Sequence, residues 1–255
     1  MMKRTYVLTI ITGLISFLCA ALPVAAENPD YHKILATIDE QSNFTNTDFS
    51  TLLNIIRKDP DEGTKVMKVS SFRRDSEDKF VMLTLEPQAE KGQGYLMIDS
   101  NLWFYDPESR KFSHTSMKES FSNTDANNSD FRRSSRSTDY AVTSGTEGTL
   151  GKYDVYVLEL QANNNEVAYP HLKMWIQKEN DLVLKVEDYS LNDRILRTEY
   201  YPSYVKLDGR YLPSRMIFVD ALTPGKQTDI SLSDMSLAKL PDSVFTKAFI
   251  ERASR

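Results

Sequence analysis

Cysteine is almost absent from this sequence, because Cys19 is the only one in 255 residues. It lies inside an apolar run near the amino terminus, so a chain cut after that run would contain no cysteine. Such a chain could form neither a disulfide nor a cysteine-based zinc site, and it could not use thiol catalysis. Its stability would have to come from an ordinary hydrophobic core.

Histidine is also scarce, and the three histidines, His32, His114 and His171, are far apart in the sequence. They lack the spacing of metal ligands on one helical turn, and no nucleophile elbow, P-loop or dinucleotide-binding glycine pattern occurs. The sequence therefore predicts no metal and no cofactor. A serine, a histidine and an aspartate could still converge in space, so catalysis by an unfamiliar constellation stays open.

The sequence contains one long apolar run, which lies at the amino terminus. After two basic residues, residues 6–22 form a nearly uncharged run that is too short to span a bilayer comfortably. Val24 and Ala26 then supply the small side chains that a signal peptidase needs before its cut. We therefore predict that residues 1–26 are a cleavable signal peptide and that the protein is exported.

An alternative interpretation makes Cys19 a lipoprotein acylation site, which would anchor the protein to a membrane. Leu18 argues against it, because the lipoprotein peptidase prefers a small residue directly before the cysteine. Cleavage after Ala26 is therefore the preferred prediction.

An excess of positive charge is missing as well. The formal charge is −5, and removing Lys3 and Arg4 with the signal peptide makes it −7. Binding to nucleic acid depends on clustered lysine and arginine, so we do not expect it. No second apolar run reaches membrane length, and residues 27–255 can bury a sizeable core. We predict one domain over residues 27–255, without a membrane span.

Most of the remaining chain has the residue patterns that are typical of β-strands. A short helix comes first, because Asp30 is a suitable N-cap and apolar residues recur on one helical face over 31–38. The turns at Asn180-Asp181, Asn192-Asp193, Asp208-Gly209 and Pro224-Gly225 tolerate tight reversals. The fold class is therefore mainly β and antiparallel. The predicted strands are 49–57, 65–73, 80–85, 94–98, 102–105, 153–161, 172–177, 182–189, 195–205, 211–221 and 228–237.

Residues 113–140 interrupt this pattern and are rich in Ser, Asn, Asp and Arg. Segments of this length without strands are usually functional or disordered, so we expect a long excursion or a mobile loop. Within it, residues 131–136 form a small basic island in an acidic protein. This island is either part of a solvated loop or a contact for an anionic head group or a partner.

Several predicted strands are apolar on one side only, as in Leu172, Met174 and Ile176 against Lys173 and Gln177. One face of the sheet is therefore apolar. That face is either filled by its own side chains or curls around a cavity for an apolar ligand. The alternation alone does not distinguish the two.

A resemblance to a known family joins these pieces. Residues 94–107, GYLMIDSNLWFYDP, resemble a strand, turn and strand of the LolA family of periplasmic lipoprotein carriers. The resemblance extends over roughly residues 65–250 to LolA-like outer-membrane lipoprotein-sorting proteins. The further matching segments are YVLEL at 156–160, LKMWI at 172–176, LDGRYLPSRM at 207–216 and LPDSVFT at 240–246. Each segment is short, and their order and spacing together make the signal specific.

This resemblance implies an incomplete antiparallel β-barrel, or half-barrel, with a few short helices covering the concave face and an apolar cavity beneath them. It implies a periplasmic chaperone that carries lipids or lipoproteins to the outer membrane. Its ligands would be acyl chains of lipoproteins or phospholipids, and its protein partners an inner-membrane donor and an outer-membrane acceptor. With strand parity added, the expected cavity lining is Phe80, Met82, Leu96, Ile98, Tyr156, Leu158, Leu172, Met174, Ile176, Leu184, Met216 and Phe218.

Two other functions stay open on the sequence. A lipid-cleaving hydrolase of the phospholipase or esterase type could use the same apolar cavity. A periplasmic scaffold that senses lipid or protein could use the same fold without transport.

Overall fold

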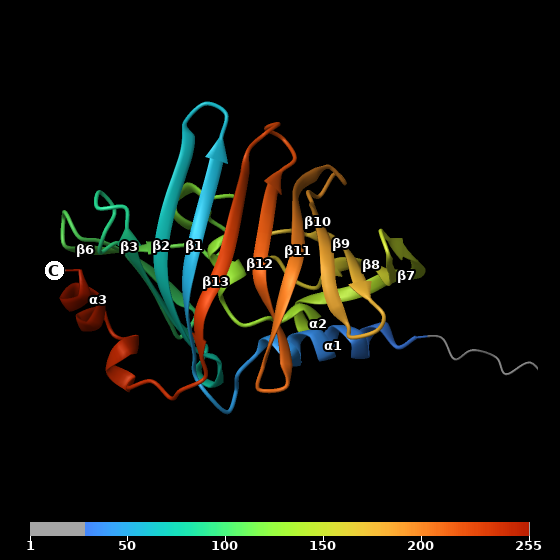
Figure 1. Cartoon of the computed structure of the whole chain (residues 1–255), viewed down its shortest axis with the longest axis horizontal. Coiled ribbons are helices and arrows are strands. Elements are labelled where there is room, and N and C mark those ends of the chain that lie inside the picture. Colours follow the sequence, from blue (N-terminus) through green and yellow to red (C-terminus); the bar gives the residue numbers. More distant parts are fainter. Residues whose placement is uncertain (1–28, 255) are drawn as a thin grey trace, which may run out of the picture.

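The structure is a computed structural model that describes residues 29–254. The predicted signal peptide and Cys19 lie outside the described residues. The described chain is dominated by one 13-stranded sheet in which every pairing of neighbouring strands is antiparallel (Figure 1). The predicted fold class is therefore confirmed.

Two antiparallel meanders make up this sheet. The first contains β1 (Phe49–Asp59), β2 (Gly63–Arg74), β3 (Lys79–Glu86), β4 (Gly94–Ile98), β5 (Asn101–Asp106) and β6 (Lys111–Thr115). The second contains β7 (Tyr140–Leu150), β8 (Tyr153–Ala162), β9 (His171–Gln177), β10 (Leu182–Tyr189), β11 (Ile195–Leu207), β12 (Arg210–Asp220) and β13 (Gln227–Ser236). Because β1 pairs with β13, the meanders join in the middle, and β6 and β7 form the two open edges of the half-barrel.

The predicted turns are confirmed, and the two edge strands were missed. Asp181, Asp193 and Asp208 lie in the turns β9–β10, β10–β11 and β11–β12, respectively. All three have positive φ angles, between 48° and 56°. Edge strands pair on one side only and tolerate polar residues, so they lose the alternation that marks a strand in a sequence. β7 reads YAVTSGTEGTL, and Tyr140 is its only buried residue.

The helix α1 (Tyr31–Ser42) begins where the sequence predicts. The Asp30 side chain accepts a hydrogen bond of 3.0 Å from a backbone N–H in the first turn, which satisfies one of the free donors at the helix start. Leu35 and Ile38 are buried against residues of β8, β9 and β10. We call the side of the sheet that α1 covers the inner face.

A second cover for the inner face is the segment 116–139, which we call the crossover because it connects edge strand β6 to edge strand β7. It contains the 3-10 helices η2 (Phe121–Asn123) and η3 (Asn128–Phe131) and the one-turn helix α2 (Arg136–Asp139). Phe121 and Phe131 are 0% and 6% exposed and pack into a core formed mainly by the first meander. Figure 1 shows the crossover passing behind the sheet. The chain therefore makes the predicted excursion, and its aromatic residues are packed on the sheet and not solvated.

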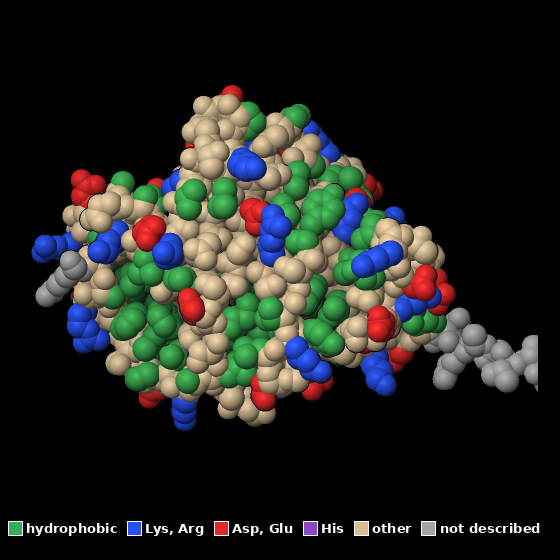
Figure 2. All heavy atoms as spheres, in the orientation of Figure 1, with side chains coloured by type: hydrophobic (Ala, Val, Ile, Leu, Met, Phe, Trp, Pro, Cys, Tyr) green, Lys and Arg blue, Asp and Glu red, His purple; other side chains and the backbone are tan. Residues whose placement is uncertain are grey.

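The carboxyl-terminal helices lie on the opposite, outer face. The 3-10 helix η4 (Asp242–Phe245) and α3 (Lys247–Ala253) pack Phe245 and Ile250 against Val81 and Leu83 of β3. α1 and the crossover cover the concave face as expected, but α3 does not, and the sequence did not predict this helix. In Figure 2, hydrophobic side chains form several separate patches among charged ones, including one beside α3.

The burial of Phe121 gives a test of the crossover. Phe121→Ala is expected to lower the free energy of unfolding by about 3–5 kcal/mol, because it leaves a cavity in the core. Urea denaturation followed by circular dichroism would measure the change. Leu191→Ala is the control, because Leu191 is 78% exposed, and its effect should stay below about 0.5 kcal/mol. A neutral Phe121→Ala would show that the crossover is not part of the core.

Candidate ligand-binding site

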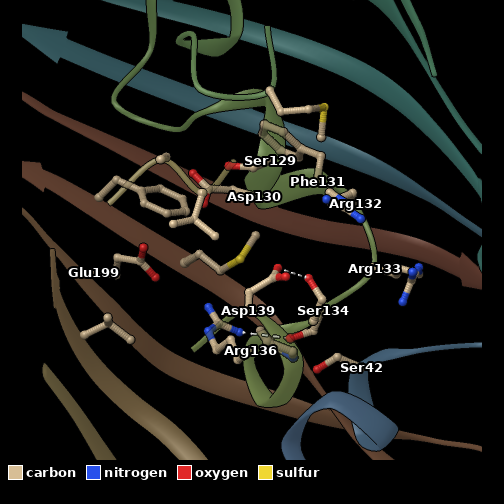
Figure 3. A pocket seen from close by; sticks show the side chains of 18 of the residues that line it. Ser42, Ser129, Asp130, Phe131, Arg132, Arg133, Ser134, Arg136, Asp139 and Glu199 are labelled. Carbon is tan, nitrogen blue, oxygen red and sulfur yellow. Dashed lines mark hydrogen bonds between the residues drawn. The ribbon is translucent and has the colours of Figure 1, made fainter. Parts of the chain in front are cut away.

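A pocket of about 280 Å³ lies between α1, the crossover and the inner face of the sheet. This volume is near the lower end of the range for small-molecule sites, roughly 300–1,000 Å³. Residues of both meanders line the pocket, so it lies at the junction of β1 and β13. Figure 3 shows crossover residues 129–136 along one side, Glu199 on the sheet and Ser42 at the end of α1.

The floor of the pocket is apolar. Met216 and Phe218 come from β12, Leu53 from β1 and Leu232 from β13. Met216 is half-buried and packs against both the cluster under the crossover and the cluster under α1. Phe131 of the crossover also lines the pocket. Methionine adapts to groups of different shape, so this floor can adjust to an apolar ligand.

Arg197 in β11 is the centre of a buried ion network at the edge of this floor. Its side chain is 4% exposed and donates to Asp188 and to Asp130 at 2.6 Å each, and also to Glu199. Glu199 accepts a further hydrogen bond from Tyr201. Asp130 belongs to the crossover and the other residues to the sheet, so this network ties the crossover to β10 and β11.

Burial and charge act in opposite directions on the pKa values of these carboxylates. Burial raises the pKa of Asp188 well above its ordinary value, against the attraction of Arg197. Burial also acts to raise the pKa of Glu199, but Arg197 and Arg136 outweigh it and hold this pKa below its ordinary value. Glu199 is therefore kept charged, whereas Asp188 takes up a proton more readily as the pH falls.

Asp39 joins α1 to the start of α2. Its carboxylate accepts hydrogen bonds from the backbone N–H groups of Arg136 at 3.0 Å and Ser137 at 2.8 Å, and from the Ser137 hydroxyl at 2.7 Å. Asn43 and Ser134 exchange two further hydrogen bonds of 2.7 Å. α1 and the crossover therefore cover the pocket as one connected unit.

Five arginines line the pocket, and they differ in their partners. Among the described residues, the Arg136 side chain has no carboxylate within 4.0 Å, and its one hydrogen bond is to the Ser134 hydroxyl at 3.3 Å. Arg136 also borders a smaller pocket of about 30 Å³ between α1 and β10–β12. The ion pairs of the other four are Arg73 with Asp75, Arg132 and Arg133 with Asp78, and Arg197 with the network above.

The residues predicted to line a cavity fall into separate groups. Those that line the pocket are Leu172, Met216 and Phe218. Those in the cluster under the crossover are Phe80 and Met82. Those under α1 are Tyr156, Leu158, Met174 and Ile176. Those in the cluster under α3 are Leu96 and Ile98, while half-buried Leu184 belongs to none of these clusters.

Leu96 and Ile98 lie on the outer face, although we expected them inside. In the register of β3 and β4, Phe80 pairs with Met97 and Val81 pairs with Leu96. Directly opposite residues share a face, so Met97 joins Phe80 inside and Leu96 joins Val81 outside. Because β4 is apolar on both faces, alternation in the sequence does not reveal which face is the inner one.

The polar half of the site has no motif, and sequence reasoning missed it. Arg197, Glu199 and Tyr201 alternate along β11 and therefore share a face. In the sequence, these residues appear only as two opposite charges two positions apart, followed by a tyrosine. This pattern is common on solvated strands, so it does not indicate a buried ion network. Their burial depends on Asp130, which is distant in the sequence and reaches them only through the crossover.

The three histidines lie outside the lining of this pocket. Residues 29–254 contain no group of His, Cys, Asp and Glu arranged to hold a metal ion. His171 is instead hydrogen-bonded to Asp193 at 2.8 Å, outside the pocket lining. No helix within the described part of the chain is long and apolar enough to cross a membrane.

The Arg197 network gives a second test. Arg197→Gln is expected to lower the free energy of unfolding by about 3–5 kcal/mol at neutral pH, because buried carboxylates lose their partner. Without Arg197 their pKa values rise above those of the unfolded chain, so protonation favours the folded variant and the deficit shrinks as the pH falls. Urea denaturation at about pH 8 and about pH 5 would measure both effects.

The control for this substitution is Arg215→Gln. Arg215 pairs with Asp229 at the surface, with a side chain that is 46% exposed, so its loss should change stability little. A pH-independent deficit in Arg197→Gln would show that the carboxylates do not depend on its charge.

Comparisons with known proteins agree with this architecture. A family model described as "Uncharacterized protein" matches residues 76–252, which is more than half of the chain. No curated protein matches the sequence. Among solved structures, a LolA superfamily protein from Nitrosomonas europaea is 28% identical, with 85% of this chain and 97% of that chain covered and a TM-score of 0.74.

Two further structures are similar in fold. A DUF1329 family protein from Desulfovibrio piger is 18% identical, with 86% of this chain and 97% of that chain covered and a TM-score of 0.76. A protein domain from Vibrio parahaemolyticus, named for outer-membrane lipoprotein sorting, is 20% identical, with 87% and 98% covered and a TM-score of 0.74. The family match, the likeness to the Nitrosomonas protein and the open 13-stranded sheet together show that the chain belongs to a LolA-like family.

Proposed function

We propose that this protein binds acyl chains of lipids or lipoproteins in the pocket and carries them through the periplasm to the outer membrane. The observation that carries the proposal is the pocket itself, which has an apolar floor on the sheet and a cover that two separate segments form. Membership of a LolA-like family supports this interpretation. Binding alone is the activity, without a cofactor or a covalent step.

Burial of an acyl chain supplies the affinity. Each buried methylene contributes about 0.8 kcal/mol, so eight to ten methylenes would contribute roughly 6–8 kcal/mol before the costs of ordering. A carrier must also release its ligand, and Met117 and Met216 in the lining suit a site that repacks. The polar contacts that residues 134–137 make with α1 can be replaced by contacts with water, so this part of the cover can lift while Phe121 stays buried.

Release from the membrane is the second requirement of a carrier. Cleavage after Ala26 would give a free protein, whereas acylation at Cys19 would tether it and make it an acceptor. We expect the mass of the exported chain to equal that of residues 27–255, measured by intact-protein mass spectrometry. A lipid-modified chain that begins at Cys19 would contradict the carrier and favour a tethered acceptor.

The binding activity can be tested directly. Solvent extraction of protein purified from its native host should yield fatty acid or phospholipid, and the extracted protein should bind a fluorescent fatty acid. Met216→Trp is expected to weaken that binding about tenfold or more, because the larger side chain fills the apolar floor. Leu222→Trp is the control, because Leu222 is 46% exposed and does not line the pocket. Lipid-free protein that binds no fatty acid would refute the proposal.

A further inference from the structure

Arg136 is the arginine of the pocket whose charge has no ionic partner among the described residues. Its backbone N–H is held by Asp39 at 3.0 Å, so the start of α2 fixes where the side chain begins. The guanidinium itself donates only to the Ser134 hydroxyl at 3.3 Å. A guanidinium has five N–H donors in a planar fork, so most of its donors remain available.

The acidic groups nearest to Arg136 are already engaged elsewhere. Glu199 is paired with Arg197 and accepts from Tyr201, and Asp39 accepts from backbone and hydroxyl donors of α2. Asp130 is paired with Arg197 as well. Their charges attract Arg136 from a distance, but none of the three comes within ion-pair distance of its guanidinium. The N–H donors of Arg136 therefore stay free of carboxylate partners among the described residues.

The position of Arg136 relative to the apolar floor is the second observation. Figure 3 shows Arg136 well separated from Phe131, which lies beside Asp130 and Arg132. Met216 and Phe218 line the same pocket. The pocket therefore combines a guanidinium that has no ion pair among the described residues with an apolar floor, and an amphiphile with an anionic head would complement both.

We propose that Arg136 binds the anionic head group, a carboxylate or a phosphate, of a single-chain amphiphile whose chain lies over Met216 and Phe218. This inference rests on the proposed function and names its ligand class. Both anions accept two parallel hydrogen bonds from a guanidinium. The volume of about 280 Å³ suits one chain better than the several chains of a lipoprotein.

The purified protein with bound lipid removed provides the test, with three ligands that share one alkyl chain length. Palmitate carries a carboxylate, hexadecyl phosphate a phosphate, and hexadecanol no charge. Competition with a neutral fluorescent probe measures their affinities. For Arg136→Gln, binding of the preferred anion is expected to weaken about 10- to 100-fold, while hexadecanol binding stays unchanged. The anion that loses more affinity identifies the head group.

Two further variants separate charge from structure. Arg136→Lys keeps the charge and should retain part of the preference for the anion over hexadecanol. Arg215→Gln removes an arginine that does not line the pocket and should change nothing. Equal weakening of anion and alcohol in Arg136→Gln would make Arg136 a structural residue and overturn the inference, while the proposed function would stand. Native protein that binds none of the three ligands would overturn the proposed function.

Discussion

The charge of Arg197, buried in the sheet, holds the crossover over the inner face. Arg197 donates to Asp130 and to the backbone carbonyl of Asp125, so one side chain of the second meander contacts the crossover at two places. Asn163, which follows β8, adds hydrogen bonds to the carbonyls of Thr138 and Asp139. The pocket exists only because the crossover spans the junction of the two meanders. Pocket, cover and buried charge are therefore parts of one arrangement.

Two parts of the crossover are attached by different interactions. Residues 121–131 bury Phe121, Ala126 and Phe131 in a core made mainly by the first meander, and separating such contacts exposes apolar surface to water. Residues 134–137 are attached to α1 by hydrogen bonds with Asp39 and Asn43, which water can replace at lower cost. The pocket lies beside residues 134–137, so the proposed ligand could enter there while Phe121 stays in place.

How much of this the sequence predicts depends on how locally each feature is encoded. The cap at Asp30 and the turn at Asp208 depend on a few neighbouring residues, and both were predicted. The edge strand β7 was missed because a strand with one partner needs no apolar alternation. Leu96 was placed on the wrong face because β4 is apolar on both sides. The pairing of Arg197 with Asp130 joins residues 67 positions apart, and no local pattern encodes it.

The pairing of β1 with β13 also governs when this protein can fold. The first meander can form while the rest of the chain is still being made, but the junction closes only after the last strand has emerged. Contacts between such distant residues carry a loop-closure entropy cost and form late. The pocket lies at this junction, so a partly made chain that lacks β13 already contains both covering segments but no complete pocket.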